Sequence, residues 1–145
     1  EPDLRLDFLT PLRRNDAVVE APNLKVSLQP LRFLDFLLEQ PAHAALLSGQ
    51  GAVVVNVPDP ARFAVHKMIV AGERPVSERP KANKDLVQAA ALVECMLDQG
   101  YADRLQEATD EVQARGPGWR SRFGKAMERL AARQPMIAER WPASS

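Results

Sequence analysis

Residues 52–60 read Ala-Val-Val-Val-Asn-Val-Pro-Asp-Pro and divide the chain into two parts of different character. Four valines in six residues predict a β-strand over 52–57, because β-branched side chains favour the extended backbone. Asp59 is a good helix N-cap, and Pro60 suits the first helical position, where its missing N–H costs nothing. The chain therefore changes from strands to helices at this point.

The segment before this stretch is expected to be rich in strands. Residues 3–9 and 24–28 alternate polar and apolar side chains, which is the period of a half-buried strand. Residues 11–22 are polar, begin and end with proline, and are expected to form a loop. The apolar run 31–38 fits a short helix or a third strand, and we favour the strand. Residues 48–51 (Ser-Gly-Gln-Gly) predict a turn.

The segment after the stretch is expected to be helical. Gly72, Gly100 and Gly116 are helix ends in this interpretation, Pro135 ends the last helix, and the tail 136–145 is expected to be loosely ordered. Four helices are predicted, over residues 60–71, 81–99, 101–115 and 118–133.

The predicted fold class is therefore α+β: a small N-terminal β-sheet of about three to four strands, followed by a bundle of about four helices. We expect a sheet region over residues 1–57 and a helical region over 58–145.

Composition narrows the function classes only slightly. The 145 residues include 19 basic and 19 acidic side chains, so net charge gives no reason to propose a nucleic acid or an anionic membrane as partner. No run approaches the roughly 20 apolar residues of a membrane span. The single cysteine excludes an internal disulfide, which suits a cytoplasmic protein.

Asp7 is the first candidate for chemistry. It lies in the alternating run 3–9, and a carboxylate on a rigid strand is what a magnesium-dependent site needs. It fits equally the solvated outer face of an edge strand.

His66 and Lys67 interrupt an otherwise apolar helix. Two polar residues on a mostly buried helix face either solvent or a polar cavity. In the cavity, Lys67 would reach a phosphate and His66 would act as a base; otherwise Lys67 extends to the surface and His66 is a hydrogen-bonded core residue.

A third candidate group lies on the predicted helix 81–99. Lys81, Lys84, Asp85 and Gln88 are spaced to share one face, and the lysines fall in the first turn, where the helix dipole favours anions. They form a phosphate site, or only a solvated polar face with a Lys81–Asp85 pair.

The predicted helix 118–133 carries a basic stripe, formed by Arg122, Lys125, Arg129 and Arg133. Such a stripe contacts a nucleic-acid backbone in some proteins. In most proteins it is the solvent-exposed face of an amphipathic helix.

Four segments together resemble a known group of proteins. Residues 57–71 (Val-Pro-Asp-Pro-Ala-Arg-Phe-Ala-Val-His-Lys-Met-Ile-Val-Ala) followed by 81–86 (Lys-Ala-Asn-Lys-Asp-Leu) are similar to bacterial nucleotidyltransferase-like proteins of the DNA polymerase β-type superfamily. This group is related to nucleotidyltransferase toxins of the abortive-infection kind, which suggests a toxin–antitoxin role. Residues 4–11 and 31–37 resemble it as well, so the similarity extends over about residues 3–133.

The resemblance implies a nucleoside triphosphate donor, Mg²⁺ as cofactor, and transfer of a nucleotidyl group to an acceptor hydroxyl on RNA, protein or a small molecule. Asp7 then corresponds to the third metal-binding carboxylate of the family and Lys67 to the lysine on the helix after the sheet. Lys84 and Asp85 correspond to the basic–acidic pair near the substrate. In this chemistry, metal ions and lysines neutralise the transferring phosphoryl group.

The sequence departs from the family pattern at one point. It contains no Gly-Ser turn followed by Asp-x-Asp, which carries the first two metal ligands. We therefore expect the chain to be the C-terminal part of a longer enzyme, inactive by itself, or a degenerate relative. The alternatives are a nucleotide- or RNA-binding module without chemistry, and a helical protein-interaction domain.

Overall fold

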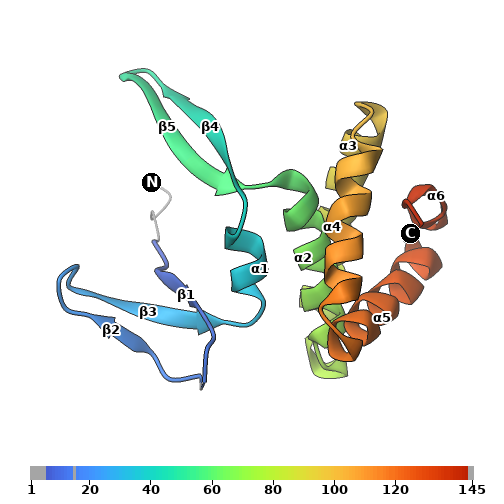
Figure 1. Ribbon diagram of the computed structural model, residues 1–145, viewed down its shortest axis with the longest axis horizontal. Coiled ribbons are helices and arrows are strands. Elements are labelled where there is room, and N and C mark those ends of the chain that lie inside the picture. The colour runs from blue at the N-terminus through green and yellow to red at the C-terminus, as the bar shows by residue number, and fades with distance from the viewer. Residues whose placement is uncertain (1–5, 15, 144–145) are drawn as a thin grey trace.

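The computed structural model describes residues 6–14 and 16–143 (Figure 1). It is an α+β fold, as predicted: two small sheets lie on one side and the major helices on the other. The three-stranded sheet has the order β1-β3-β2, with β1 parallel and β2 antiparallel to β3. The second sheet is the antiparallel hairpin β4–β5. The strands are β1 (Leu9–Pro11), β2 (Val19–Ala21), β3 (Val26–Leu31), β4 (Pro41–Ser48) and β5 (Gly51–Pro58).

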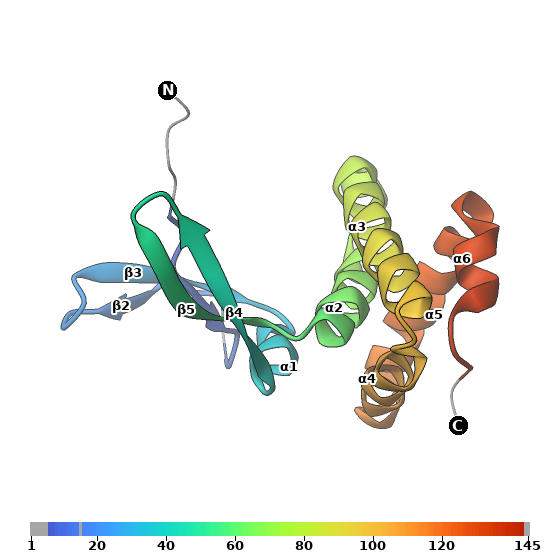
Figure 2. The same ribbon diagram turned by 90° about the horizontal axis from the view of Figure 1, so that it is seen from above.

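In the helical part, α2 lies nearest the sheets and packs against α3, α4 and α5, whereas α6 packs against α5 and α3 (Figure 2). Val65, Met68 and Ile69 of α2 are completely buried. The helices are α1 (Leu34–Leu38), α2 (Pro60–Glu73), α3 (Arg79–Asp98), α4 (Ala102–Ala114), α5 (Pro117–Arg133) and α6 (Pro135–Arg140), with a 3₁₀ turn η1 (Val76–Glu78) before α3. No described helix is both long and apolar enough to cross a membrane.

The predicted junction at residues 52–60 is confirmed. β5 ends at Pro58, and the Asp59 carboxylate accepts hydrogen bonds from the backbone N–H groups of Ala61 and Arg62, at 2.9 and 3.1 Å. These bonds satisfy two of the N–H groups that a helix start leaves without partners.

The strand predicted over 31–38 is wrong, because the run forms the helix α1 after β3 ends at Leu31. A strand would place Leu34, Phe36 and Leu38 on one face. Instead Leu34, Phe36 and Leu37 are buried, with Phe36 in the core formed by the helices, while Leu38 is exposed. Burial of both Phe36 and Leu37 does not fit a strand with one buried face, and it fits the period of a helix.

The other strands differ from the prediction in position and number. Residues 3–5 lie outside the described part, residues 6–8 are not in a strand, and β1 begins only at Leu9. The predicted loop 11–22 contains β2, which pairs with β3, and the unpredicted β4 pairs with β5 across the predicted turn.

The predictions for the end of the first long helix and for the C-terminal tail also differ from the structure. Gly72 does not end α2 but lies within it, facing the backbone of α5: a Cβ at this position would lie 1.9 Å from the Arg122 carbonyl oxygen. Glycine is therefore required here by close helix packing. The expectation of a loose tail is wrong for residues 136–141, because α6 brings Ile137 and Trp141 into the core.

Candidate functional site

The helices α2 and α3 meet at a buried carboxylate that holds two cations. Lys67 Nζ donates to Asp85 Oδ1 at 3.0 Å, and Arg74 Nε donates to Oδ2 at 2.8 Å. Asp85 is only 5% exposed. Arg74 directly follows the last residue of α2, seven residues after Lys67, which brings both side chains to the same side of the helix. Both oxygens of Asp85 are thus occupied, and both cations have fixed positions.

These residues line a cleft of about 400 Å³ between the β3–α1 connection and the helices α2 and α3. Its apolar lining includes Leu31, Phe33 and Val70. Six charged side chains complete the lining: Arg32, Lys67, Arg74, Glu73, Glu78 and Asp85. A concave, partly apolar site with convergent charged groups is the usual form of a small-molecule site.

Ion pairs link the charged residues of the cleft. Arg32 pairs with Glu73 at 3.0 Å, and Arg74 pairs with Glu78 at 2.8 Å as well as with Asp85. Hydrogen bonds, first from Arg122 and also from Arg32, lower the pKa of Glu73. Burial opposes ionisation of Arg74, but its hydrogen bonds to Asp85 and Glu78 raise its pKa. Arg74 therefore stays charged, and Arg32, Lys67 and Arg74 all already have anionic partners.

His66 lines the same cleft in a neutral form. Burial, with a further contribution from the charge of Lys67, lowers the pKa of His66 to about 4. Both ring nitrogens are buried and neither has a hydrogen-bond partner among the described residues. Neutral imidazole offers one donor and one acceptor, but both nitrogens are shielded here, so His66 bonds a ligand in the cleft only after its ring turns toward it.

The predicted site residues do not all converge. His66, Lys67 and Asp85 share the cleft. Lys81 lies at its edge, where Nζ donates to Glu78 at 3.0 Å rather than to Asp85. Lys84 is exposed and is not part of the cleft lining. Lys81 and Lys84 thus differ in environment from Asp85, which turns toward α2.

Asp7 lies elsewhere. It is exposed, precedes β1, and lines a separate hollow of about 380 Å³ with Leu6, Phe8 and Gln29, among others. Within residues 6–14 and 16–143, no group of three or more His, Cys, Asp or Glu side chains can hold a metal ion. The described residues therefore do not fit the two-metal site that the resemblance implies.

Arg74 and Arg32 were not identified from the sequence. Arg74 lies seven residues after Lys67, but the predicted helix end at Gly72 concealed that the two residues share a side of α2. Arg32 had no signal, since it lies at the tight connection before α1, where Phe33 has a φ of 63°.

Comparison with known proteins identifies a family for most of the chain. A family model described as nucleotidyltransferase matches residues 1–114, a range that includes every residue of the cleft. No curated protein and no solved structure matches the chain. Because the match covers well over half of the 145 residues, the chain belongs to this nucleotidyltransferase family.

Proposed function

We propose that the chain binds a nucleoside triphosphate in the cleft, as part of a protein that transfers a nucleotidyl group to an acceptor hydroxyl. In that reaction the acceptor oxygen bonds to the α-phosphorus and its hydroxyl proton passes to solvent. The bond from the α-phosphorus to the bridging oxygen breaks, and pyrophosphate leaves. The single observation that carries the proposal is the junction of Lys67, Arg74 and Asp85 in a family whose members act on nucleotides.

The roles of the cleft residues follow from their charges. Lys67 and Arg74 are proposed to contact the triphosphate, and Asp85 to hold their side chains in place before the ligand arrives. This arrangement lowers the ordering cost of binding, because two long side chains are already fixed. The ligand competes with Glu78 for Arg74, and Glu78 lies on the exposed rim, where an ion pair contributes little.

His66 is proposed to bind the base or the ribose. As a neutral group it does not add to the positive charge, so its contribution is directional hydrogen bonding. The apolar side chains of Leu31, Phe33 and Val70 provide a surface against which a base can pack. Lys81 and Lys84 remain predicted contacts for the substrate, reached from the exposed side of α3.

Binding without turnover is the proposed activity of this chain by itself. Members of this family act with Mg²⁺, and no described cluster of ligands fits that ion. The same observation favours the second candidate function, a nucleotide-binding module without chemistry. We assign the described residues the binding step only.

Calorimetric titration with each of the four ribonucleoside triphosphates tests this proposal, together with a pyrophosphate-release assay in the presence of Mg²⁺. We expect binding of at least one triphosphate and no sustained release. Lys67→Met should weaken binding at least tenfold, while Asp85 keeps its partner Arg74 and the fold survives. Lys125→Met, an exposed change on α5, is the matched control and should bind like the parent chain.

Three outcomes would contradict the proposal. The first is absence of binding by all four triphosphates. The second is unchanged binding by Lys67→Met. The third, sustained pyrophosphate release, would overturn the statement that this chain alone only binds. Thermal unfolding of each variant, followed by circular dichroism, shows whether a loss of binding reflects loss of the fold.

A further inference from the structure

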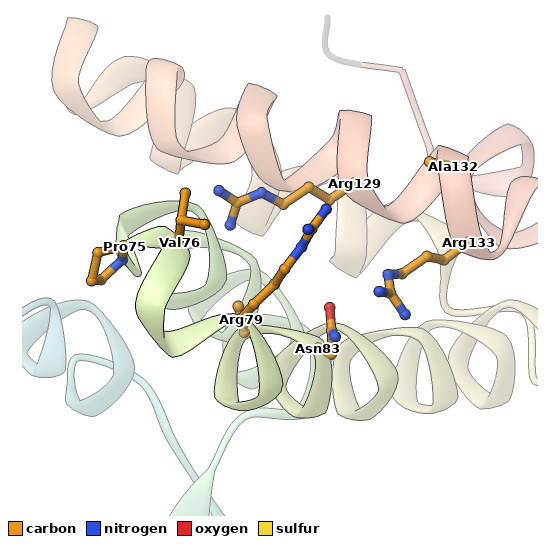
Figure 3. A pocket seen from close by; sticks show the side chains of 8 residues that line it. Pro75, Val76, Arg79, Asn83, Arg129, Ala132 and Arg133 are labelled. Carbon is orange, nitrogen blue, oxygen red and sulfur yellow. The ribbon is translucent and has the colours of Figure 1, made fainter.

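A second pocket lies on the helical part, between the start of α3 and α5, and has a volume of about 240 Å³. Arg79 and Asn83 of α3 line it, together with Arg129 and Arg133 of α5. Figure 3 shows Arg79 and Asn83 extending from α3 toward α5, and Arg133 extending from α5 toward α3. Pro75 is the one residue that this pocket shares with the cleft, so the charged residues of the two are different.

The charge of this pocket is unbalanced. Three arginines line it and no carboxylate does. None of the ion pairs between described residues involves Arg79, Arg129 or Arg133, although six other arginines of the helical part pair with a carboxylate. Those six are Arg62, Arg74, Arg104, Arg115, Arg122 and Arg140.

The arrangement is also partly fixed in advance. Arg129 Nη1 donates to the carbonyl oxygen of Ala71, at 2.8 Å, which holds its guanidinium beside the end of α2. Arg79 is the first residue of the 20-residue helix α3, where the helix dipole adds positive potential. Asn83 lies one turn further along α3 and adds a side-chain amide donor.

We propose that this pocket binds a phosphate group. Guanidinium groups present paired N–H donors that match phosphate oxygens, and such charge-assisted bonds are stronger than neutral ones. The volume is smaller than the roughly 300–1,000 Å³ of pockets that enclose a whole drug-sized ligand, so it suits a phosphate and not an entire nucleotide. The phosphate belongs to an RNA backbone or to a phosphorylated small molecule, and the pocket is independent of triphosphate binding in the cleft.

Only two of the four residues of the basic stripe predicted on residues 118–133 line this pocket. Arg122 pairs with Glu73 and Lys125 is exposed, while Arg129 and Arg133 line the pocket with Arg79. A site shared by two helices is more specific than a stripe on one helix, because the distance between the helices fixes the position of the anion.

Titration with inorganic pyrophosphate, followed by calorimetry and by amide NMR spectra, tests the pocket. We expect amide signals of residues 79–83 and 129–133 to shift. The double variant Arg79→Gln/Arg133→Gln should weaken the pyrophosphate binding that these amide shifts report at least tenfold, whatever pyrophosphate binds in the cleft. Arg13→Gln/Arg14→Gln removes two exposed charges beside β1 and is the matched control, with less than a twofold effect expected.

A second series separates this site from the cleft. Lys67→Met should leave the shifts at residues 79–83 in place even if the cleft binds no triphosphate at all. A ten-nucleotide RNA and ATP, each titrated into Lys67→Met so that the cleft does not take up the ATP, distinguish the two sources of the phosphate. An RNA source gives tighter binding by the RNA and a steep loss with added salt. Tighter binding by either ligand supports the site, provided the double variant reduces it. No shift at residues 79–83 with any ligand, or equal losses in both double variants, overturns the proposal.

Discussion

Lys67 and Asp85 are 18 residues apart in the chain, yet their side chains meet at 3.0 Å between α2 and α3, where Arg74 holds the other oxygen of Asp85. Asp85→Asn removes the charge that both cations share. We expect the free energy of unfolding to fall by about 1–3 kcal/mol, which is the cost of losing charge-assisted hydrogen bonds at a buried site. Urea unfolding measures this change.

A double-mutant cycle isolates the Lys67–Asp85 pair. If the pair contributes to folding, the effects of Lys67→Met and Asp85→Asn should not add, because the second change removes an interaction already lost. Additive effects would show that the two side chains are only neighbours.

Arg62 should be the most sensitive charged residue of the fold. Its side chain is 4% exposed, lies 4.1 Å from the centre of the Phe36 ring, and donates to the Phe36 carbonyl oxygen at 2.8 Å. It also pairs with Glu39 and Glu111. Arg62→Met leaves these acceptors without their buried partner and should destabilise the protein by about 3–5 kcal/mol.

Arg140 provides the control for this prediction. It pairs with Asp98, and the two side chains are 42% and 62% exposed, so solvent screens the interaction. Arg140→Met should change stability by less than about 1 kcal/mol. Similar losses for Arg62→Met and Arg140→Met, measured by urea unfolding, would show that burial does not set the strength of these pairs.

His66 should make stability fall as the pH is lowered. Its pKa is about 4 in the folded protein against 6.5 for an unperturbed histidine, with burial and Lys67 lowering it and Asp85 and Asp35 raising it. Between pH 6.5 and 4 the unfolded chain binds more protons, so acid favours unfolding, by up to about 3 kcal/mol. His66→Leu should flatten the dependence of unfolding free energy on pH across this window. His43→Leu, at an exposed position, should leave it in place.

The pH range separates this effect from carboxylate titration. Hydrogen bonds from Arg122 to Glu73 and from Arg62 to Glu111 lower the pKa of each glutamate from 4.5, so their stabilisation is lost only below that value. A slope between pH 6.5 and 5 that persists in His66→Leu would assign the pH dependence to another group.

Gly72 and Gly124 should respond in opposite directions to alanine. A Cβ at Gly72 would lie 1.9 Å from the Arg122 carbonyl oxygen, so Gly72→Ala forces α2 and α5 apart and should cost about 1–3 kcal/mol or more. Gly124 lies inside α5 with no heavy atom within 4 Å of its Cβ position. Gly124→Ala should stabilise by about 0.5–1 kcal/mol, because alanine favours the helix. Thermal unfolding of both variants tests the contrast, and equal shifts would contradict the packing argument.

Local signals predicted the helices better than the strands. Asp59, Pro60, Gly100 and Gly116 act at short range, so the start of α2 and the ends of α3 and α4 could be located within a few residues. Strand β4 could not be predicted in this way, because its alanines have little strand preference and form a strand only by pairing with β5. Gly72 shows the limit of the same reasoning: glycine suits a helix end and a close helix contact alike.

The candidate site was predictable in part for a similar reason. Lys67 could be identified because it is a cation in an apolar helix. Asp85 could be identified because the segment 81–86 resembles the family. Their mutual contact depends on how α2 packs against α3, which spacing within one helix does not determine. The pocket of Arg79, Arg129 and Arg133 depends likewise on packing between α3 and α5.

The hairpin β4–β5 gives the molecule two levels of local stability. Its eight paired positions are joined by backbone hydrogen bonds, but Leu46, Leu47, Val53 and Val54 at its tip are all more than 60% exposed. An isolated two-stranded ribbon without a buried face is marginally stable in water. The hairpin can therefore open and close many times while the core around α2 stays folded, and its amide protons should exchange with solvent long before those of Val65 and Met68.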